Sequence, residues 1–158
     1  MRRADTRVRR GRPRERIVPK ARKAGYYARS LAALGRVAAS RRQLLRRLVR
    51  PAGVLALRDG TVLELASRLD LLLLKEVVCD DVYGLRSLDP GPRTIVDVGA
   101  SIGDFAVTAA RRHPEGRVLA FEPDPAAFAR LAGNMGRNGV RNVALHEVAL
   151  GALSLIHI

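Results

Sequence analysis

From residue 94 onward, short apolar runs alternate with longer segments of helical periodicity. The runs 94–98, 117–121 and 143–148 are rich in valine, leucine and alanine, which predicts buried strands. Between them, residues 104–113 and 125–138 place apolar side chains at helical spacing. Because strand and helix alternate, we expect an α/β fold whose parallel strands are joined by right-handed crossovers.

The preceding part of the chain follows other patterns. Residues 26–50 repeat apolar side chains at helical spacing with arginines between them, which predicts one amphipathic helix. Two apolar runs, 54–57 and 61–65, flank Asp59-Gly60 and predict a β-hairpin. Residues 69–78 predict a further helix that covers the sheet.

A turn with two glycines follows the strand predicted over residues 94–98. Gly99 and Gly103 lack a Cβ, so this turn can be tight and a ligand can approach its backbone closely. The free N–H groups of the next helix face the same place. Asp97 precedes the turn, and Glu122 follows the next strand, where a carboxylate can accept both hydroxyls of a ribose. Together these residues predict a nucleotide-binding site at the carboxyl ends of the strands.

The loop sequence distinguishes between two kinds of nucleotide cofactor. It reads Asp-Val-Gly-Ala-Ser-Ile-Gly over residues 97–103 and lacks the G-x-G-x-x-G pattern of dinucleotide sites. The Asp97 carboxylate would repel a pyrophosphate, whereas it would attract the positively charged amino and sulfonium groups of S-adenosylmethionine. We therefore expect methyl transfer rather than hydride transfer.

These motifs resemble those of the FkbM family of methyltransferases. The resemblance rests on residues 96–105, VDVGASIGDF, on residues 118–124, VLAFEPD, and on the stretch from Leu131 to Val143. Upstream, residues 57–61 and the stretch from Lys75 to Tyr83 resemble the lead-in of the same family, so that the match covers about residues 53–151. One departure is Ser101, where the family often has asparagine. Both side chains are small and polar, so we expect the loop to accept this change.

The resemblance implies a Rossmann-like class I methyltransferase fold, S-adenosylmethionine as methyl donor, and O-methylation of a sugar or natural-product hydroxyl. It also implies that Asp97 orients the amino-acid part of the donor, through the loop or a water molecule, and that Glu122 holds the ribose. Tyr83 either lies near the methionine portion or is a plain core or rim tyrosine. No catalytic base is identifiable, and no histidine spacing predicts a metal site. The predicted cofactor-binding residues are Asp97, Gly99, Ala100, Ser101, Gly103, Glu122, Pro123 and Tyr83.

Positive charge is concentrated in the first third of the chain. The formal net charge is +14, but residues 1–50 hold 18 Lys and Arg against two acids, whereas residues 51–158 hold 11 against 13. Residues 1–24 predict a disordered basic arm. This arm is a solvated tail, a segment translated from upstream of the natural start, or a contact to nucleic acid or an anionic membrane surface. The basic helix over residues 25–50 is expected to pack on its own domain or a partner subunit, or to lie on a membrane.

Two absences in the sequence bear on location. No apolar run approaches the ~20 residues that span a membrane. The lone cysteine, Cys79, excludes an internal disulfide and fits a reducing compartment, so we expect a cytoplasmic protein.

The patterns divide the chain into five parts. They are the arm 1–24, the helix 25–50, a lead-in hairpin and helix over 51–92, the N-terminal half of an S-adenosylmethionine-binding domain over 93–152, and a non-native tail over 153–158. By the resemblance, a complete sheet has more strands than this chain supplies.

We therefore expect the donor-binding half of a longer enzyme that acts on a small-molecule or glycan acceptor. This half would be inactive by itself, and its sheet would have an open apolar edge and uncovered faces. The alternatives are a nucleic-acid methyltransferase that uses the basic arm and a non-catalytic remnant that binds a nucleotide such as NAD.

Overall fold

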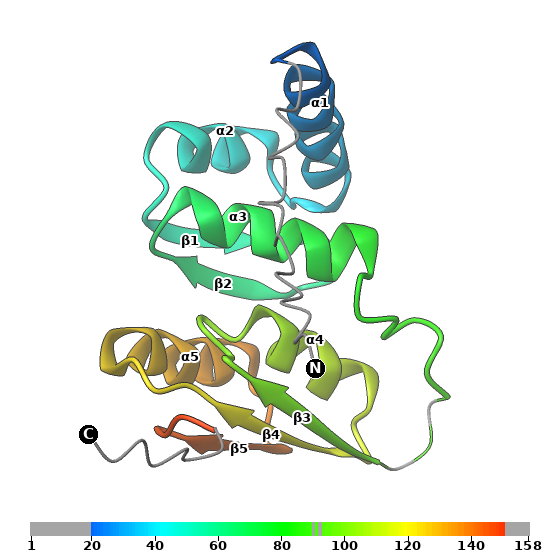
Figure 1. Ribbon diagram of the computed structural model, residues 1–158, viewed down its shortest axis with the longest axis vertical. Helices are drawn as coiled ribbons and strands as arrows, with labels where there is room; N and C mark the ends of the chain where they lie inside the picture. Colours follow the sequence, from blue (N-terminus) through cyan, green and yellow to red (C-terminus); the bar gives the residue numbers. More distant parts are fainter. Residues whose placement is uncertain (1–19, 90, 92, 151–158) are drawn as a thin grey trace, which may run out of the picture.

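The computed structural model describes residues 20–89, 91 and 93–150 (Figure 1). Residues 1–19 of the predicted arm and the whole predicted tail, 153–158, lie outside the described residues. Among the residues described, no helix has the length and apolar character needed to cross a bilayer. The elements in chain order are α1 (Lys20–Val37), α2 (Arg41–Val49), β1 (Gly53–Ala56), β2 (Val62–Leu65), α3 (Arg68–Lys75), the π-helix η1 (Glu76–Asp80), β3 (Thr94–Val98), α4 (Asp104–Arg112), β4 (Arg117–Phe121), α5 (Pro125–Asn138) and β5 (Val143–His146).

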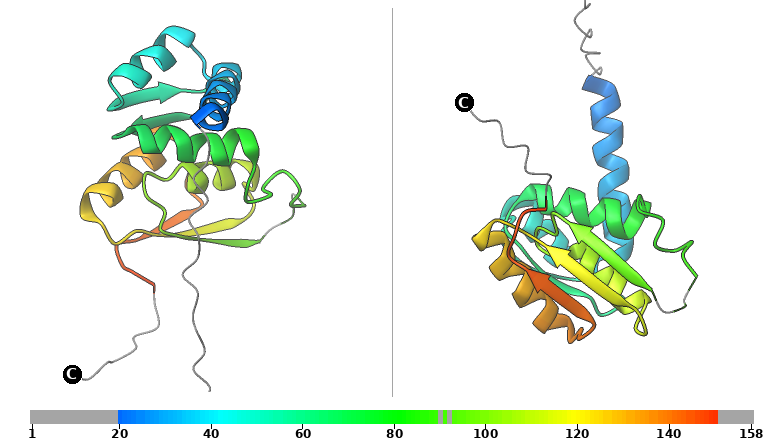
Figure 2. Two further views of the ribbon diagram at one scale, coloured as in Figure 1. Left: turned by 45° about the horizontal axis from the view of Figure 1, so that its top comes forward. Right: turned by 60° about the horizontal axis from the view of Figure 1, so that its bottom comes forward.

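The second half forms the predicted α/β unit. Strands β3, β4 and β5 are parallel and adjacent in that order, which confirms the predicted Rossmann-like alternation of strand and helix. Because both crossovers run in the same direction across the sheet, α4 and α5 lie on the same face of it (Figure 2). The other face exposes Val96 and Val98, and the strand register puts Leu119 and Phe121 beside them. Of the uncovered faces predicted for the sheet, the structure therefore shows one, because α4 and α5 cover the other.

The predicted hairpin is also confirmed. Strands β1 and β2 are antiparallel, and Leu55 and Leu63 on their inner face are fully buried. The outer edge of β2 lies against α5, where two asparagine side chains replace a further strand. Asn138 exchanges hydrogen bonds with the backbone of Val62, and Asn134 does so with the backbone of Glu64. Side-chain amides thus satisfy the polar groups of this edge.

The single helix predicted over residues 25–50 is interrupted in the structure. Ala38 forms an isolated bridge with Leu57, and the Ala39 N–H donates to the Ala56 carbonyl at 2.9 Å. Ser40 then starts α2 by accepting a hydrogen bond from the Gln43 N–H at 3.3 Å. Periodicity continues through this break because both helices bury a leucine, Leu34 of α1 and Leu44 of α2, in the same hydrophobic core. Helix α1 also begins at Lys20, inside the range predicted to be disordered.

The helix predicted over residues 69–78 begins at Arg68 and continues as η1 to Asp80. Ser67 and Asp70 form a capping box at its start, which fixes that boundary. The prediction that this helix covers the sheet is wrong. It packs against α1, β2 and α4, and α4 lies between it and β3 (Figure 1).

Replacing Asn134 by alanine should destabilise the fold by roughly 3 kcal/mol. The fully buried Asn134 amide donates to the carbonyls of Ile102 and Glu64 and accepts the Glu64 N–H, so its removal leaves one buried and two partly buried backbone groups without this partner. Urea unfolding followed by circular dichroism measures the change. Ala132→Gln on the exposed side of the same helix is the control, with an expected change within about 0.5 kcal/mol. Equal stability of Asn134→Ala and the wild type would contradict this account.

Candidate functional site

The loop between β3 and α4 is held in one tight conformation. Gly99, Ser101 and Gly103 all have positive φ angles, of 80°, 49° and 83°. The N–H groups of Gly99 and Ala100 both donate to the Phe121 carbonyl at 2.9 Å, so the loop is tied to the end of β4. This conformation turns the chain out of the sheet and directly into α4.

Glu122 holds the same loop from the side of β4. One carboxylate oxygen accepts the Ser101 N–H at 2.8 Å, and the other accepts the Asp124 N–H at 2.9 Å. The Glu122 N–H in turn donates to the His146 carbonyl of β5 at 3.0 Å. The buried carboxylate is therefore fixed in orientation, and each of its oxygens keeps a further lone pair for another donor.

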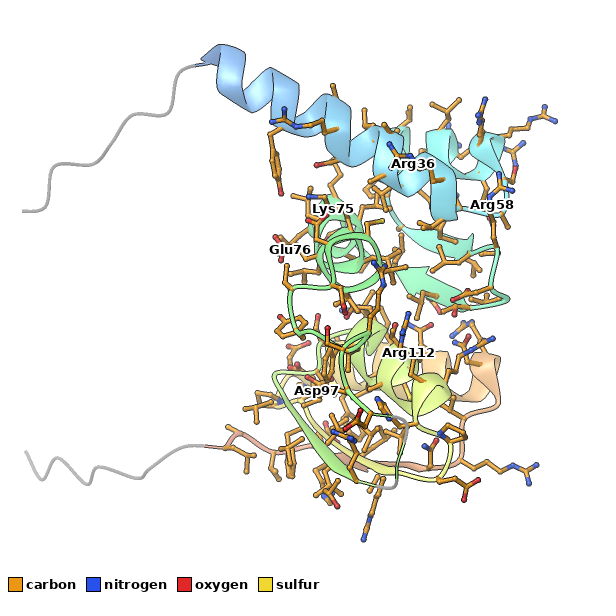
Figure 3. The ribbon with its side chains drawn as sticks, turned by 90° about the vertical axis from the view of Figure 1, so that its right-hand side faces the viewer. Arg36, Arg58, Lys75, Glu76, Asp97 and Arg112 are labelled. Atoms are coloured by element: carbon orange, nitrogen blue, oxygen red, sulfur yellow. The ribbon has the colours of Figure 1, made fainter. Side chains whose placement is uncertain are left out.

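A pocket of about 200 Å³ lies where the end of β3, the loop and the start of α4 meet η1. Figure 3 shows Glu76 of η1 and Asp97 of β3 on the same side of the molecule. Five of the predicted cofactor-binding residues line this pocket, namely Asp97, Gly99, Ala100, Ser101 and Tyr83.

The other three predicted residues do not line the pocket. Pro123 is exposed, and the Glu122 carboxylate holds the loop through the Ser101 N–H. The space freed at Gly103 is taken by α5 rather than left open for a ligand. A Cβ there would lie 2.5 Å from Leu131 Cδ1 and 2.7 Å from Met135 Cε, so this glycine lets α4 and α5 pack closely. A Cβ at Gly99, in contrast, would meet nothing within 4 Å.

Two acidic residues of the pocket were missed by the sequence analysis. Asp104, the first residue of α4, is only 5% exposed, and one of its carboxylate oxygens is buried without a hydrogen-bond partner. Glu76 comes from η1, which the tertiary packing brings to the end of β3. Asp104 lies within the motif of residues 96–105, so its carboxylate could have been predicted from the sequence to belong to the site. Nothing in the local sequence marked Glu76.

Burial changes the acidity of the pocket carboxylates. It raises the pKa of Asp97 to about 7, and the nearby charges of Asp104 and Glu122 add to the effect. Burial also raises the pKa of Asp104 to about 6, although backbone N–H groups that bond its carboxylate act in the opposite direction. One Asp97 oxygen, like that of Asp104, is buried without a partner. A cation in the pocket would supply the missing interaction for both side chains.

Tyr83 stands at the rim of the pocket. Its ring packs edge-on against Phe105 with 5.0 Å between the ring centroids, and the residue is 61% exposed. The structure thus agrees with a rim tyrosine that also borders the pocket. Within the described part of the chain, no group of three or more His, Cys, Asp or Glu residues could hold a metal ion.

Replacing Asp97 by asparagine should stabilise the fold above pH 7. The pKa of Asp97 is raised from 3.8 to about 7 on folding, so its contribution to stability is greatest at low pH and is lost as the pH rises toward 7. Asparagine does not ionise, so the variant does not lose stability in this way and should be more stable than the wild type at pH 8 by about 1–3 kcal/mol. Unfolding midpoints between pH 4 and pH 8 test this, with the exposed Asp89→Asn as control. A constant difference between variant and wild type across this range would refute the raised pKa.

No protein-family model matches this chain. It is 38% identical over 77 residues to Methyltransferase 1 of Beauveria bassiana, which is 49% of this chain and 30% of that protein. It is 38% identical over 83 residues to Methyltransferase sdnD of Sordaria araneosa, covering 52% of this chain and 29% of that protein. The 31-O-demethyl-FK506 methyltransferase FkbM of Streptomyces tacrolimicus is 41% identical over 69 residues, covering 43% of this chain and 26% of that protein.

Among solved structures, TYW2 of M. jannaschii in complex with AdoMet matches with a TM-score of 0.46 and 21% identity. The match covers 62% of this chain and 44% of that one. The chain spans less than a third of the length of the three curated methyltransferases that it matches. The predicted resemblance to FkbM-type methyltransferases is thus confirmed as sequence similarity over about half of this chain.

Proposed function

We propose that this chain carries the donor-binding part of an S-adenosylmethionine-dependent methyltransferase. The observation that carries the proposal is the acidic pocket at the end of β3, in which Asp97 and Asp104 each have a buried carboxylate oxygen without a partner. Such oxygens suit the positively charged amino and sulfonium groups of this donor. Sequence similarity to proteins named methyltransferases supports the same activity. When bound, S-adenosylmethionine supplies a methyl group carried on its sulfonium.

The residues of the site have distinct roles in this proposal. Asp97 holds the charged amino-acid end of the donor, and the open space above Gly99 lets the donor contact the loop backbone. Glu122 accepts the ribose hydroxyls with the lone pairs that the Ser101 and Asp124 N–H groups leave free. We assign Pro123, which follows Glu122, and Tyr83, at the rim of the pocket, to contact with the donor.

The charge of the pocket argues against a dinucleotide. A pyrophosphate beside Asp97, Asp104 and Glu76 would meet like charges in a partly buried space, where repulsion is stronger than in water. The positive φ angles of the loop let a bound cofactor come close to its backbone, and this holds for a dinucleotide as well as for S-adenosylmethionine. The charge of the pocket is therefore the property that favours one of these cofactors over the other.

For the acceptor, we propose a hydroxyl group of a sugar or natural product. The support comes from a relative whose name specifies 31-O-demethyl-FK506 as its substrate. We assign no residue of the described chain as the base that would accept the hydroxyl proton. A cytoplasmic location stays a prediction of the sequence.

Titration calorimetry should show saturable binding of S-adenosylmethionine and no binding of NAD. Replacing Glu122 by alanine should weaken donor binding tenfold or more, because each charge-assisted hydrogen bond contributes about 1.5–3 kcal/mol. Glu115→Ala, an exposed acid in the turn after α4, is the control. Because Glu122 also holds the loop, the unfolding midpoint of the Glu122→Ala variant is measured in parallel. Saturable binding of NAD alone would favour the dinucleotide alternative, and an unchanged donor affinity in a folded Glu122→Ala would refute the role of this residue.

The affinity for S-adenosylmethionine should rise between pH 6 and pH 8. Asp97, with a pKa of about 7, is largely protonated at the lower pH and must lose its proton to pair with a cation. The expected change is up to about tenfold per pH unit below this pKa. Asp97→Asn should bind more weakly and show a flatter pH profile, which calorimetry at several pH values measures. A wild-type profile as flat as that of the variant would exclude a direct pairing.

A further inference from the structure

A groove of about 760 Å³ lies between α1 and α2, at the end of the molecule away from the sheet (Figure 1). Its floor is apolar and consists of Leu31, Ala32, Gly35, Leu44, Leu45 and Leu48. Leu31 is 42% exposed and Leu45 is 62% exposed, although other leucines of the same helices are buried. The structure therefore leaves an aliphatic strip open to solvent.

Both walls of this groove are fixed by contacts outside it. On the side of α1, Lys75 at the end of α3 lies 4.6 Å from the Tyr26 ring centroid and 2.5 Å from an Asp80 carboxylate oxygen. On the side of α2, the Gln43 amide donates to the Val54 carbonyl and accepts the Ala56 N–H, each at 3.1 Å. The groove is thus preformed, so that a ligand would not have to order it.

Arginines border the apolar floor. Arg36, Arg41 and Arg58 line the groove, and Figure 3 shows Arg36 and Arg58 on the part of the molecule built from α1, α2 and the hairpin. Residues 16–58 contain no aspartate or glutamate. Among the described residues, these three arginines form no salt bridge. The groove therefore offers positive charge that this segment of the chain does not neutralise.

We propose that this groove binds an acidic amphipathic helix of a partner protein. Helix α2 has nine residues, and at about 1.5 Å per residue it offers room for roughly two turns of a bound helix. Apolar side chains of the partner, spaced three and four residues apart, would contact the leucines, and its carboxylates would pair with the arginines. Gly35 adds a bare stretch of backbone that lets a helix approach closely, because a Cβ there would meet nothing within 4 Å.

The shape and composition of the groove favour this occupant over two others. A flat bilayer would reach Val49, which is exposed and lies outside the groove, but not the buried Leu44 in the floor. A single-stranded nucleic acid binds through aromatic stacking as well as positive charge, and none of the residues that line the groove is aromatic.

The test uses the full chain and a fluorescent acidic peptide that carries leucines at i, i+3, i+4 and i+7 with glutamates on the other face. Fluorescence anisotropy at physiological salt should show saturable binding. A peptide of the same composition with scrambled leucine positions should bind at least tenfold more weakly. Equal binding of the two peptides would overturn the proposal, because charge alone would then explain the affinity.

Two variants locate the binding in the groove. Gly35→Leu fills the open space without changing the charge, and leucine also favours a helix more than glycine does, so the fold should persist. It should weaken peptide binding tenfold or more. Arg36→Gln should weaken binding several-fold, whereas its matched control Arg42→Gln, on α2 but outside the groove, should have little effect. Unchanged binding in a folded Gly35→Leu would overturn the proposal.

The other occupants give distinct results. Vesicles of phosphatidylserine and phosphatidylcholine should not compete with the peptide. If the chain sediments with these vesicles, and this requires Val49 but is unchanged in Gly35→Leu, a membrane contact would replace the proposal. If the chain binds an RNA oligonucleotide and the affinity falls equally in Arg36→Gln and Arg42→Gln, diffuse electrostatic attraction would replace the proposal. The donor site is not involved, so either outcome leaves the proposed methyltransferase function untouched.

Discussion

The side-chain amide of Asn134 joins the parts of this molecule that build the pocket. From α5 it bonds the Ile102 carbonyl of the loop and both backbone groups of Glu64 in the hairpin. The Asn134 amide and the Ile102 carbonyl are buried and the Glu64 groups are partly buried, so they depend on protein partners for their hydrogen bonds. Through this amide the hairpin keeps its place on α5. The hairpin and α4 then support α3, whose π-helical continuation η1 brings Glu76 to the end of β3.

The pocket collects acidic groups that the fold alone would not favour. Asp97 and Asp104 are held in partly or largely buried positions where ionisation is costly, and both pKa values are raised. Polar groups that destabilise the folded chain yet persist are typical of sites that bind a ligand. The basic end of the molecule has the opposite character, with arginines around an apolar groove between α1 and α2. The structure thus carries an acidic and a basic surface on different elements.

Local sequence patterns were sufficient for the elements of the second half of the chain. Strands β3 and β4 and helix α5 have the predicted bounds, because each is a periodic run that ends in a turn residue. The loop around Gly99 was predicted for the same reason. The break at Ser40 was missed, since apolar spacing alone does not show that a chain folds back on a hairpin. Gly103 was assigned to ligand contact, although its neighbours in space, Leu131 and Met135, come from another helix.

By itself, the sequence determined the order of strands and helices, the parallel sheet and the acids at two strand ends. These properties follow from periodicity, glycine turns and charge, which act between residues close together along the chain. Only the tertiary structure decided that Glu76 and Asp104 join Asp97 in one pocket and that Glu122 holds the loop. It also decided that α1 and α2 leave a groove open between them. Contacts between distant residues depend on how whole elements pack, and no local pattern encodes that packing.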